Sequence, residues 1–188
     1  MQTLYIESIN IPNSVLTIGI VAFSGCSKLK EFTFSENLKK ISFESFANCD
    51  ALENLVIPNK VESIDMSAFI CCDNLKSVRI SDSVKSIDRE AFAECGNLTS
   101  VICGKSLKEI GYQAFGGCWN LKEMYFLSPE KPKFGFQGRR GRSGVWVYCL
   151  PDYYERYFLQ VADYQSTSGD MFFYASPIFT FDPQWLPI

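Results

Sequence analysis

Cysteines are the residues of this 188-residue chain whose type and spacing are best suited to chemistry. Five of the eight recur at one constant interval along the chain, at Cys26, Cys49, Cys72, Cys95 and Cys118. A straight row with one thiol per period suits a tetrahedral zinc site poorly, and the chain has no Cys-x-x-Cys pair. Disulfides between neighbouring periods would also need the right side-chain orientation. The spacing therefore favours reduced thiols that pack as small hydrophobes, with disulfides as the alternative and no metal expected.

The chain contains no histidine. This absence removes Ser-His-Asp and Cys-His nucleophile pairs, histidine general bases and histidine metal ligands. The segment Gly104-Lys105-Ser106 resembles the end of a phosphate-binding loop, but Thr99 stands where that motif needs its first glycine. Because no nucleophile–base pair and no cofactor motif remains, we expect a non-enzymatic protein without a cofactor.

The charged residues do not indicate nucleic acid or a membrane as the partner. The formal net charge is -3, and the one basic cluster, Arg139, Arg140 and Arg142, lies in an otherwise acidic protein. Such a cluster is more often a solvated loop than a site for nucleic acid, heparin-like glycans or phosphate. No stretch approaches the roughly 18 apolar residues of a membrane helix, so we expect no membrane insertion.

The periodic cysteines belong to a larger repeat with the same period. A phenylalanine stands three residues before each of them, and a leucine three residues after. The phenylalanines are Phe23, Phe46, Phe69, Phe92 and Phe115, and the leucines are Leu29, Leu52, Leu75, Leu98 and Leu121. A fixed period of this length is typical of a solenoid, in which each coil buries its apolar side against its neighbours.

Each copy predicts the same local structure. In one copy, Val78 and Ile80 alternate with outward-facing residues, which predicts a strand with one buried face. A second apolar pair, Val84 and Ile87, follows and leads into a turn. The small residue Ala91 then predicts a short, tightly packed helical turn opposite the strand.

The pattern Ile-x-x-x-Ala-Phe-x-x-Cys-x-x-Leu-x-x-Ile/Val-x-Ile, which residues 87–102 follow up to its last position, resembles the BspA-type leucine-rich repeat. The resemblance covers residues 1–127 and implies an α/β fold. That fold is a right-handed leucine-rich-repeat solenoid with a parallel sheet on the concave face and short helical turns opposite. Members of this family are typically secreted or surface proteins of gut and oral bacteria and of some protozoan parasites. They are associated with adhesion to host or matrix components.

Residues 128–188 are expected to form a divergent last repeat and a C-terminal cap. Residues 128–144 are rich in Pro and Gly and predict a loop, and residues 145–150 are predicted to be a sixth strand. Residues 151–159 predict a helix, so that a strand-helix cap would close the array. The aromatic-rich tail that follows is expected to pack on the cap or the sheet.

The outward-facing strand residues form rows that run along the predicted sheet. One row contains Arg79, Ile102, Tyr125 and Tyr148, and a neighbouring row ends at Trp146. We predict these five residues as the partner-binding site, because clustered exposed aromatics often anchor partners. The alternative is that the aromatic tail covers this patch, which then belongs to the core.

Two functions follow from these patterns. The first is an interaction or adhesion module that binds a protein or glycan partner, such as a host or matrix component, through the strand face. The alternative is a structural spacer that displays part of a larger surface protein and has no ligand of its own. We expect a monomer that is secreted or at the cell surface. Because the repeat pattern has already begun at Ile9, we also expect the chain to be a fragment of a longer parent.

Overall fold

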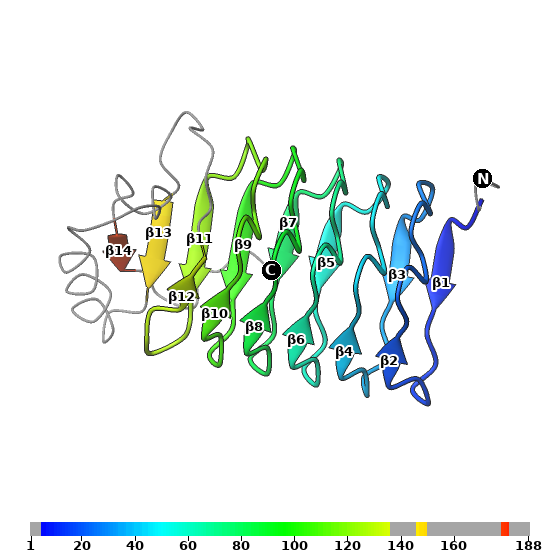
Figure 1. Cartoon of the computed structure of the whole chain (residues 1–188), viewed down its shortest axis with the longest axis horizontal. Helices are drawn as coiled ribbons and strands as arrows, with labels where there is room; N and C mark the ends of the chain where they lie inside the picture. Colours follow the sequence, from blue (N-terminus) through cyan, green and yellow to red (C-terminus); the bar gives the residue numbers. More distant parts are fainter. Residues whose placement is uncertain (1–4, 136–145, 150–177, 181–188) are drawn as a thin grey trace.

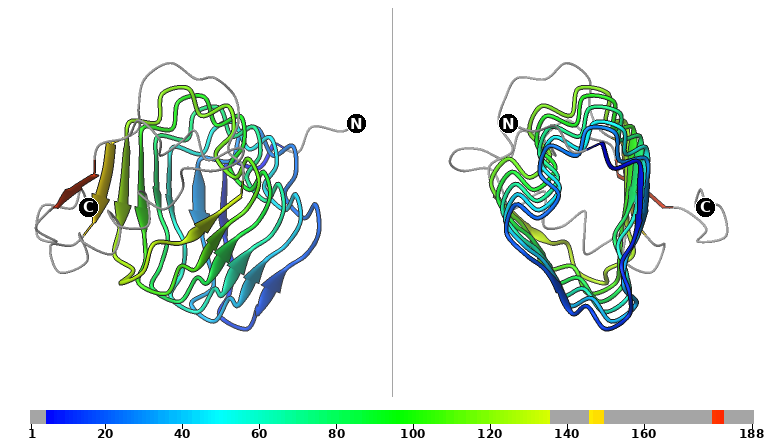
Figure 2. Two further views of the ribbon diagram at one scale, coloured as in Figure 1. Left: turned by 60° about the vertical axis from the view of Figure 1, so that its left-hand side comes forward. Right: turned by 90° about the vertical axis from the view of Figure 1, so that its right-hand side faces the viewer.

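The structure, a computed structural model, is a parallel β-solenoid whose coils stack along one axis (Figure 1). It describes residues 5–135, 146–149 and 178–180, and for the last two segments it describes the backbone alone. Viewed down the axis, successive coils superimpose closely (right view of Figure 2). The predicted solenoid, with one coil for each copy of the repeat, is therefore confirmed.

Parallel strands run along the axis on two sides of the solenoid, and from β1 to β13 the strands of one side alternate with those of the other along the chain. The longer strands lie on one side, which we call the strand face: β1 Ser8–Asn10, β3 Glu31–Thr33, β5 Asn54–Val56, β7 Ser77–Arg79, β9 Ser100–Cys103, β11 Glu123–Phe126, β13 Trp146–Cys149 and β14 Ile178–Thr180. Two-residue strands form the second sheet: β2 Thr17–Ile18, β4 Lys40–Ile41, β6 Ser63–Ile64, β8 Ser86–Ile87, β10 Glu109–Ile110 and β12 Lys133–Phe134.

The strands pair in the register of the sequence period. On the strand face Val78 lies opposite Leu55 and Val101, which hold the same position in the preceding and following copies of the repeat. In the second sheet Ile87 pairs with Ile64 and Ile110 in the same way. Identical positions of neighbouring coils therefore lie side by side, and each apolar position becomes a buried row.

The second sheet and its last strand were missed by the sequence analysis. The pair Val84 and Ile87 predicted buried positions but no strand, since a two-residue strand leaves no alternation to detect. Strand β12 lies inside the stretch that predicted a loop, and it pairs with β10 so that Ile110 stands opposite Phe134. This pairing is one residue longer than the repeat period, and the inserted residue hides the partner from a search at that period.

The helical turns predicted opposite the strands are wrong, because the described residues contain no helix. Each coil instead places two residues with positive φ four positions apart, such as Ser67 (56°) and Cys71 (57°). Because of these left-handed residues, alternate peptide groups of the turn point along the solenoid axis, toward the neighbouring coil. The N–H of Phe69 consequently donates to the C=O of Ala91 in the next coil (2.8 Å), whereas a helix would keep this bond within one coil.

The core contains a column of phenylalanine rings, one from each coil. Neighbouring rings of Phe46, Phe69, Phe92 and Phe115 have centroids 5.1 to 5.4 Å apart and interplanar angles of 5° or less. Each of these four rings is at most 2% exposed. The prediction that the phenylalanines and cysteines point inward is confirmed for these coils.

The sheet on the strand face is interrupted between β3 and β5, which Figure 1 shows as a wider gap than between other neighbouring strands. Strand β3 and its following residue carry Phe32 and Phe34 where β5 and its following residue carry Leu55 and Ile57. Both rings contact the ring of Phe46, with centroids 4.6 and 5.7 Å away. Two rings need more room than a leucine and an isoleucine, and we infer that they hold β3 away from β5.

The predicted sixth strand is confirmed as β13, which pairs with β11 in register. Strand β14 continues the sheet beyond β13, so part of the C-terminal tail does join the sheet. The helix predicted at residues 151–159, and with it the helical part of the strand-helix cap, lies outside the described residues. The described part of the chain is all β, and the α/β class is not supported.

Gly104 is expected to be a position where only glycine fits. A Cβ atom there would overlap the backbone oxygen of Ser81, whereas one at Gly96 would have no atom within 4 Å. Gly104→Ala should lower the free energy of unfolding by about 1–3 kcal/mol through overpacking. Urea denaturation of both variants checks this, and similar losses for Gly104→Ala and Gly96→Ala would contradict it.

Ser45 is the one residue of the described chain whose buried side-chain hydroxyl has no hydrogen-bond partner. The same position in other coils is occupied by alanine, as at Ala68 and Ala91. Ser45→Ala should therefore raise the free energy of unfolding by about 1 kcal/mol. The matched variant Ser81→Ala should lower it, because that buried hydroxyl donates to the C=O of Pro58 (2.8 Å). Loss of stability in both variants would contradict the prediction.

Candidate functional site

The strand face brings four of the five predicted site residues into one row, and Trp146 lies in the neighbouring row. Arg79 lies opposite Ile102, Ile102 opposite Tyr125, and Tyr125 opposite Tyr148. Val56, which was not included in the predicted site, continues the row beside Arg79. Parallel pairing at a constant register is sufficient to produce this alignment.

Exposure differs strongly along this row. Val56 is 63% exposed and Arg79 is exposed, whereas Ile102 is only 5% exposed. The expectation of an exposed side chain at Ile102 is therefore wrong, although its register is the predicted one. Its neighbours in the row, Arg79 and Tyr125, both have longer side chains, and they stand on either side of it. The open part of the row lies at β5 and β7.

The aromatic end of the predicted site is described only in part. The side chain of Tyr125 is half-buried, and its hydroxyl donates to a carboxylate oxygen of Glu123 (3.2 Å). The backbone of β13 places Trp146 opposite Glu123 and Tyr148 opposite Tyr125. The side chains of Trp146 and Tyr148 lie outside the described part of the structure, so the choice between an exposed patch and a covered one stays open for them.

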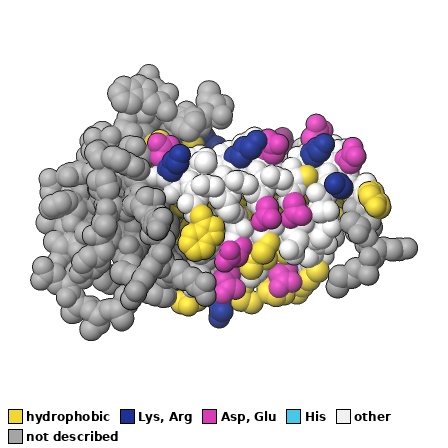
Figure 3. Space-filling view, turned by 90° about the horizontal axis from the view of Figure 1, so that it is seen from above, with side chains coloured by type: hydrophobic (Ala, Val, Ile, Leu, Met, Phe, Trp, Pro, Cys, Tyr) yellow, Lys and Arg dark blue, Asp and Glu magenta, His cyan; other side chains and the backbone are white. Residues whose placement is uncertain are grey.

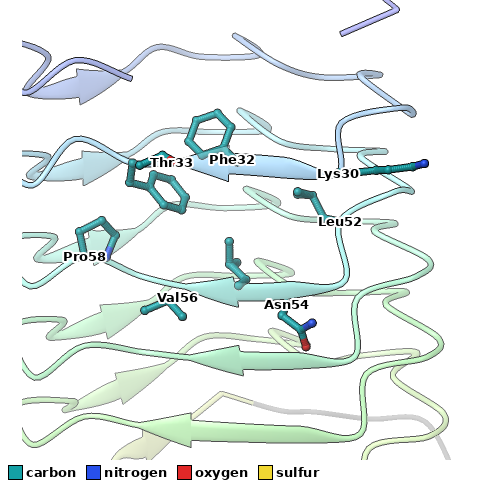
Figure 4. A pocket seen from close by; sticks show the side chains of 9 residues that line it. Lys30, Phe32, Thr33, Leu52, Asn54, Val56 and Pro58 are labelled. Carbon is teal, nitrogen blue, oxygen red and sulfur yellow. The ribbon is translucent and has the colours of Figure 1, made fainter. Parts of the chain in front are cut away.

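A pocket of about 330 Å³ lies where the sheet is interrupted (Figure 4). We call it the slit, and its lining residues are Lys30, Phe32, Thr33, Phe34, Leu52, Asn54, Leu55, Val56 and Pro58. The sequence analysis missed it. The available signal was the pair Phe32 and Phe34 at strand positions where most other coils carry aliphatic residues.

Some charges of neighbouring coils are paired. Lys76 contacts Glu53 (2.8 Å), and Lys85 contacts Glu62 (2.6 Å). Figure 3 shows acidic and basic side chains mixed along the upper edge of the face seen from above, and acidic side chains in the middle of that face. Exposed pairs of this kind add little stability.

The thiol row is a structural element of the core. All seven cysteines whose side chains are described are free. Four thiols each donate a hydrogen bond to a phenylalanine C=O of the preceding coil: Cys49 to Phe23, Cys72 to Phe46, Cys95 to Phe69 and Cys118 to Phe92, at 3.1 to 3.3 Å. The prediction that the thiols of the row pack in the core is confirmed for Cys26, Cys49, Cys72 and Cys95, which are buried. The described residues contain no cluster suited to a metal ion.

Burial raises the pKa of several of the described thiols. It raises the pKa of Cys49 to about 12 and raises the pKa of Cys103 further. Burial also raises the pKa of Cys71, and the carboxylate of Asp73 adds to this effect. Cys71 is the thiol outside the row and is partly exposed, but a raised pKa leaves little reactive thiolate at neutral pH.

Two further expectations concern segments at the limits of the described structure. The arginine cluster predicted as a solvated loop lies outside the described residues. Within the segments that are described, no helix has the length and apolar character needed to span a membrane.

Comparison with protein families identifies the repeat. Residues 1–123 match the BspA type leucine rich repeat region in six copies. The chain therefore belongs to the BspA-type leucine-rich repeat family, as the repeat pattern predicted. A comparison with functionally curated proteins finds no significant match.

Solved structures of bacterial leucine-rich repeat proteins share the fold. The leucine-rich repeat protein of T. pallidum is 32% identical with a TM-score of 0.70, over 82% of this chain and 69% of that one. A leucine rich cell surface protein of Faecalibacterium prausnitzii is 29% identical with a TM-score of 0.54, over 66% of this chain and 40% of that one. A leucine-rich repeat protein of Eubacterium ventriosum, 19% identical with a TM-score of 0.52 over 94% of this chain and 49% of that one, supports the fold alone.

The raised pKa of Cys49 predicts a loss of stability at alkaline pH. The folded protein favours the neutral thiol, so its contribution is complete below the ordinary pKa of 9.0 and falls as the pH rises toward about 12. Urea unfolding at pH 7.5 and pH 10.5 should show a larger loss for the parent protein than for Cys49→Ala. The variant is the control for the lysines and tyrosines that titrate in the same range. Equal losses in both proteins would contradict the prediction.

Proposed function

We propose that this protein is a non-enzymatic interaction module that binds a protein or glycan partner through its strand face. The observation that carries the proposal is the in-register row on this face, in which Val56 is 63% exposed and lies beside the exposed Arg79. An exposed apolar side chain next to a guanidinium group suits recognition, because arginine combines hydrogen bonding with apolar contact area.

The strand face is also rigid before a partner arrives. Strands β5, β7, β9, β11 and β13 are hydrogen-bonded in one parallel sheet, and the inward residues of β5, β7, β9 and β11 belong to the buried core. A fixed backbone lowers the entropy that a partner must remove on binding. The same rows would thus serve as a preformed surface.

The centre of the proposed site lies closer to the N-terminus than the sequence pattern indicated. Because Ile102 is buried, we place the centre at Val56 and Arg79, with Tyr125 at the edge. Trp146 and Tyr148 remain proposed contacts on the strength of their register alone.

The family and its relatives support a surface role. The F. prausnitzii relative is named as a cell surface protein, and it is similar to this chain over 40% of its own length. We infer that the present chain acts as a secreted or surface-exposed monomer and that its partner is a host or matrix component. The interspersed charges on the described surface do not favour nucleic acid.

A structural spacer is the second candidate function. Ion pairs such as Lys76–Glu53 and Lys85–Glu62 join neighbouring coils, and the continuous core suits a stiff rod. A spacer needs these features and no exposed anchor. It differs from the first candidate in giving the row of Val56 and Arg79 no role in affinity.

Replacement of the row residues separates the two functions. We expect the double variant Arg79→Ala with Tyr125→Ala to bind its partner at least 10-fold more weakly, because one anchoring residue contributes on the order of 2 kcal/mol. The measurement is biolayer interferometry against purified extracellular-matrix proteins, together with a glycan array. Circular dichroism first confirms that each variant is folded.

The chain offers a matched control on its opposite side. Arg89 lies over the ring of Tyr112 (5.4 Å), and both residues are exposed on the turns away from the strand face. The double variant Arg89→Ala with Tyr112→Ala should retain binding within twofold. Equal losses in both double variants would contradict a strand-face site, and a parent protein that binds nothing in either panel would favour the spacer.

A further inference from the structure

The slit between β3 and β5 lacks hydrogen bonds that the neighbouring junctions of the same sheet possess. The N–H of Lys76 donates to the C=O of Glu53 (2.7 Å), and the N–H of Ile57 donates to the C=O of Arg79 (2.9 Å). One period earlier, the equivalent bonds would join Glu53 to Lys30 and Phe34 to Val56. Neither bond is present in the described structure. Two N–H groups and two C=O groups are therefore left without a backbone partner at the slit.

The opening is confined to the strand face. On the other sides the same two coils are joined, since Ile41 pairs with Ile64 in the second sheet. The N–H of Phe46 also donates to the C=O of Ala68 (2.8 Å). Because the coils are bonded at their turns and at the second sheet, the slit is held open as part of the fold and not as a frayed end.

The interior of the slit is apolar and small. The half-buried rings of Phe32 and Phe34 lie on one side, and Leu52 and Leu55, at most 4% exposed, lie on the other. A volume of about 330 Å³ is at the low end of the range for ligand pockets. It suits one or two apolar side chains and is too small for a folded element.

The slit runs along the strands. Figure 4 shows Lys30 at one end, with its side chain directed away, and Pro58 at the other end. Apart from Lys30 the rim carries neutral groups, Thr33 and Asn54. A ligand would therefore be recognised by backbone hydrogen bonds and apolar contact, not by charge.

We propose that the slit is a docking site for an extended peptide segment of the partner protein. The segment lies parallel to the strands, pairs its backbone with the free groups of Lys30, Phe34, Glu53 and Val56, and places an apolar side chain against Phe32. Strand addition of this kind obtains affinity from main-chain bonds and specificity from alternate side chains. Val56 belongs both to the slit and to the exposed row, so this inference deepens the proposed function and rests on it.

The probe is the acetylated and amidated hexapeptide Lys-Ser-Val-Arg-Ile-Ser, which copies residues 76–81 and already pairs with β5 in the intact sheet. Fluorescence anisotropy of the labelled peptide measures binding to the full chain. Hydrogen exchange should slow at residues 30–34 and 53–57 when the peptide is bound. The same peptide with N-methyl groups at its Val and Ile should bind at least 10-fold more weakly, because its donors are blocked.

A variant of the protein tests the location of the site. Phe32→Leu with Phe34→Ile installs the residues of the next coil, Leu55 and Ile57, and should allow the missing bonds to form. We expect at least 10-fold weaker peptide binding without a lower unfolding midpoint. Phe126→Ile makes a similar change in β11, away from the slit, and should leave binding unchanged. If the double variant does not fold, Phe34→Ile alone takes its place and should weaken binding in the same direction.

Three outcomes would overturn the proposal: no binding at millimolar peptide, unchanged binding in the double variant, or equal binding of the N-methylated peptide. Unchanged binding in the double variant would place the peptide elsewhere, for example on the free edge of β1. Equal binding of the N-methylated peptide would mean that the slit binds apolar side chains without backbone hydrogen bonds. Partner binding in the matrix and glycan panels is measured separately. If the peptide does not bind in the slit but the Arg79 and Tyr125 variant still loses partner binding, the proposed function stands and only the slit proposal fails.

Discussion

The repeated contact between one coil and the next is the interaction on which the rest of the structure depends. A single coil buries only one of its sides, and its backbone groups along the axis have no partner within the coil. Stacking at a register of one repeat per coil buries the remaining apolar side of each coil and pairs its backbone groups. The rings of Phe69 and Phe92 lie 5.2 Å apart, and the N–H of Phe69 donates to the C=O of Ala91. The ring spacing is close to the ~4.8 Å separation of hydrogen-bonded strands, so side chains and backbone can follow one repeat.

The same constraint explains two features of the turns, which are the left-handed residues and the row of thiols. Left-handed residues such as Ser67 and Cys71 cost about 1–2 kcal/mol each where they are not glycine, yet they recur in every coil because they direct peptide groups toward the next coil. The thiols also join neighbouring coils. Cys72 is short enough for the interior, and its weak donor reaches the C=O of Phe46 in the preceding coil. A helix in this place would satisfy its own backbone and leave the coils less firmly joined.

The proposed function depends on where the regularity ends. Where the coils repeat well, some charges are paired between neighbours and Ile102 of the outward row is buried. The strand face changes character at Phe32 and Phe34, whose rings separate two strands and expose backbone groups together with an apolar interior. The exposed Val56 and Arg79 lie next to this interruption. The proposed recognition and the stability of the fold thus depend on different positions of the same repeat.

The amino-acid sequence by itself determined the period, the solenoid, the inward rows of Phe and Cys, and the alignment of Arg79, Ile102 and Tyr125. These features follow from spacing alone, since equal steps along the chain become neighbours in a stack. Only the tertiary structure decided that the turns are not helical, that Ile102 is buried and that the sheet opens between β3 and β5. Each of these depends on how one coil meets another: backbone bonds across the axis, longer neighbours on either side, and rings that need more room than aliphatic side chains. The sequence period predicts which residues of neighbouring coils lie side by side. The side-chain volumes and backbone hydrogen bonds between those coils decide which of the residues are exposed.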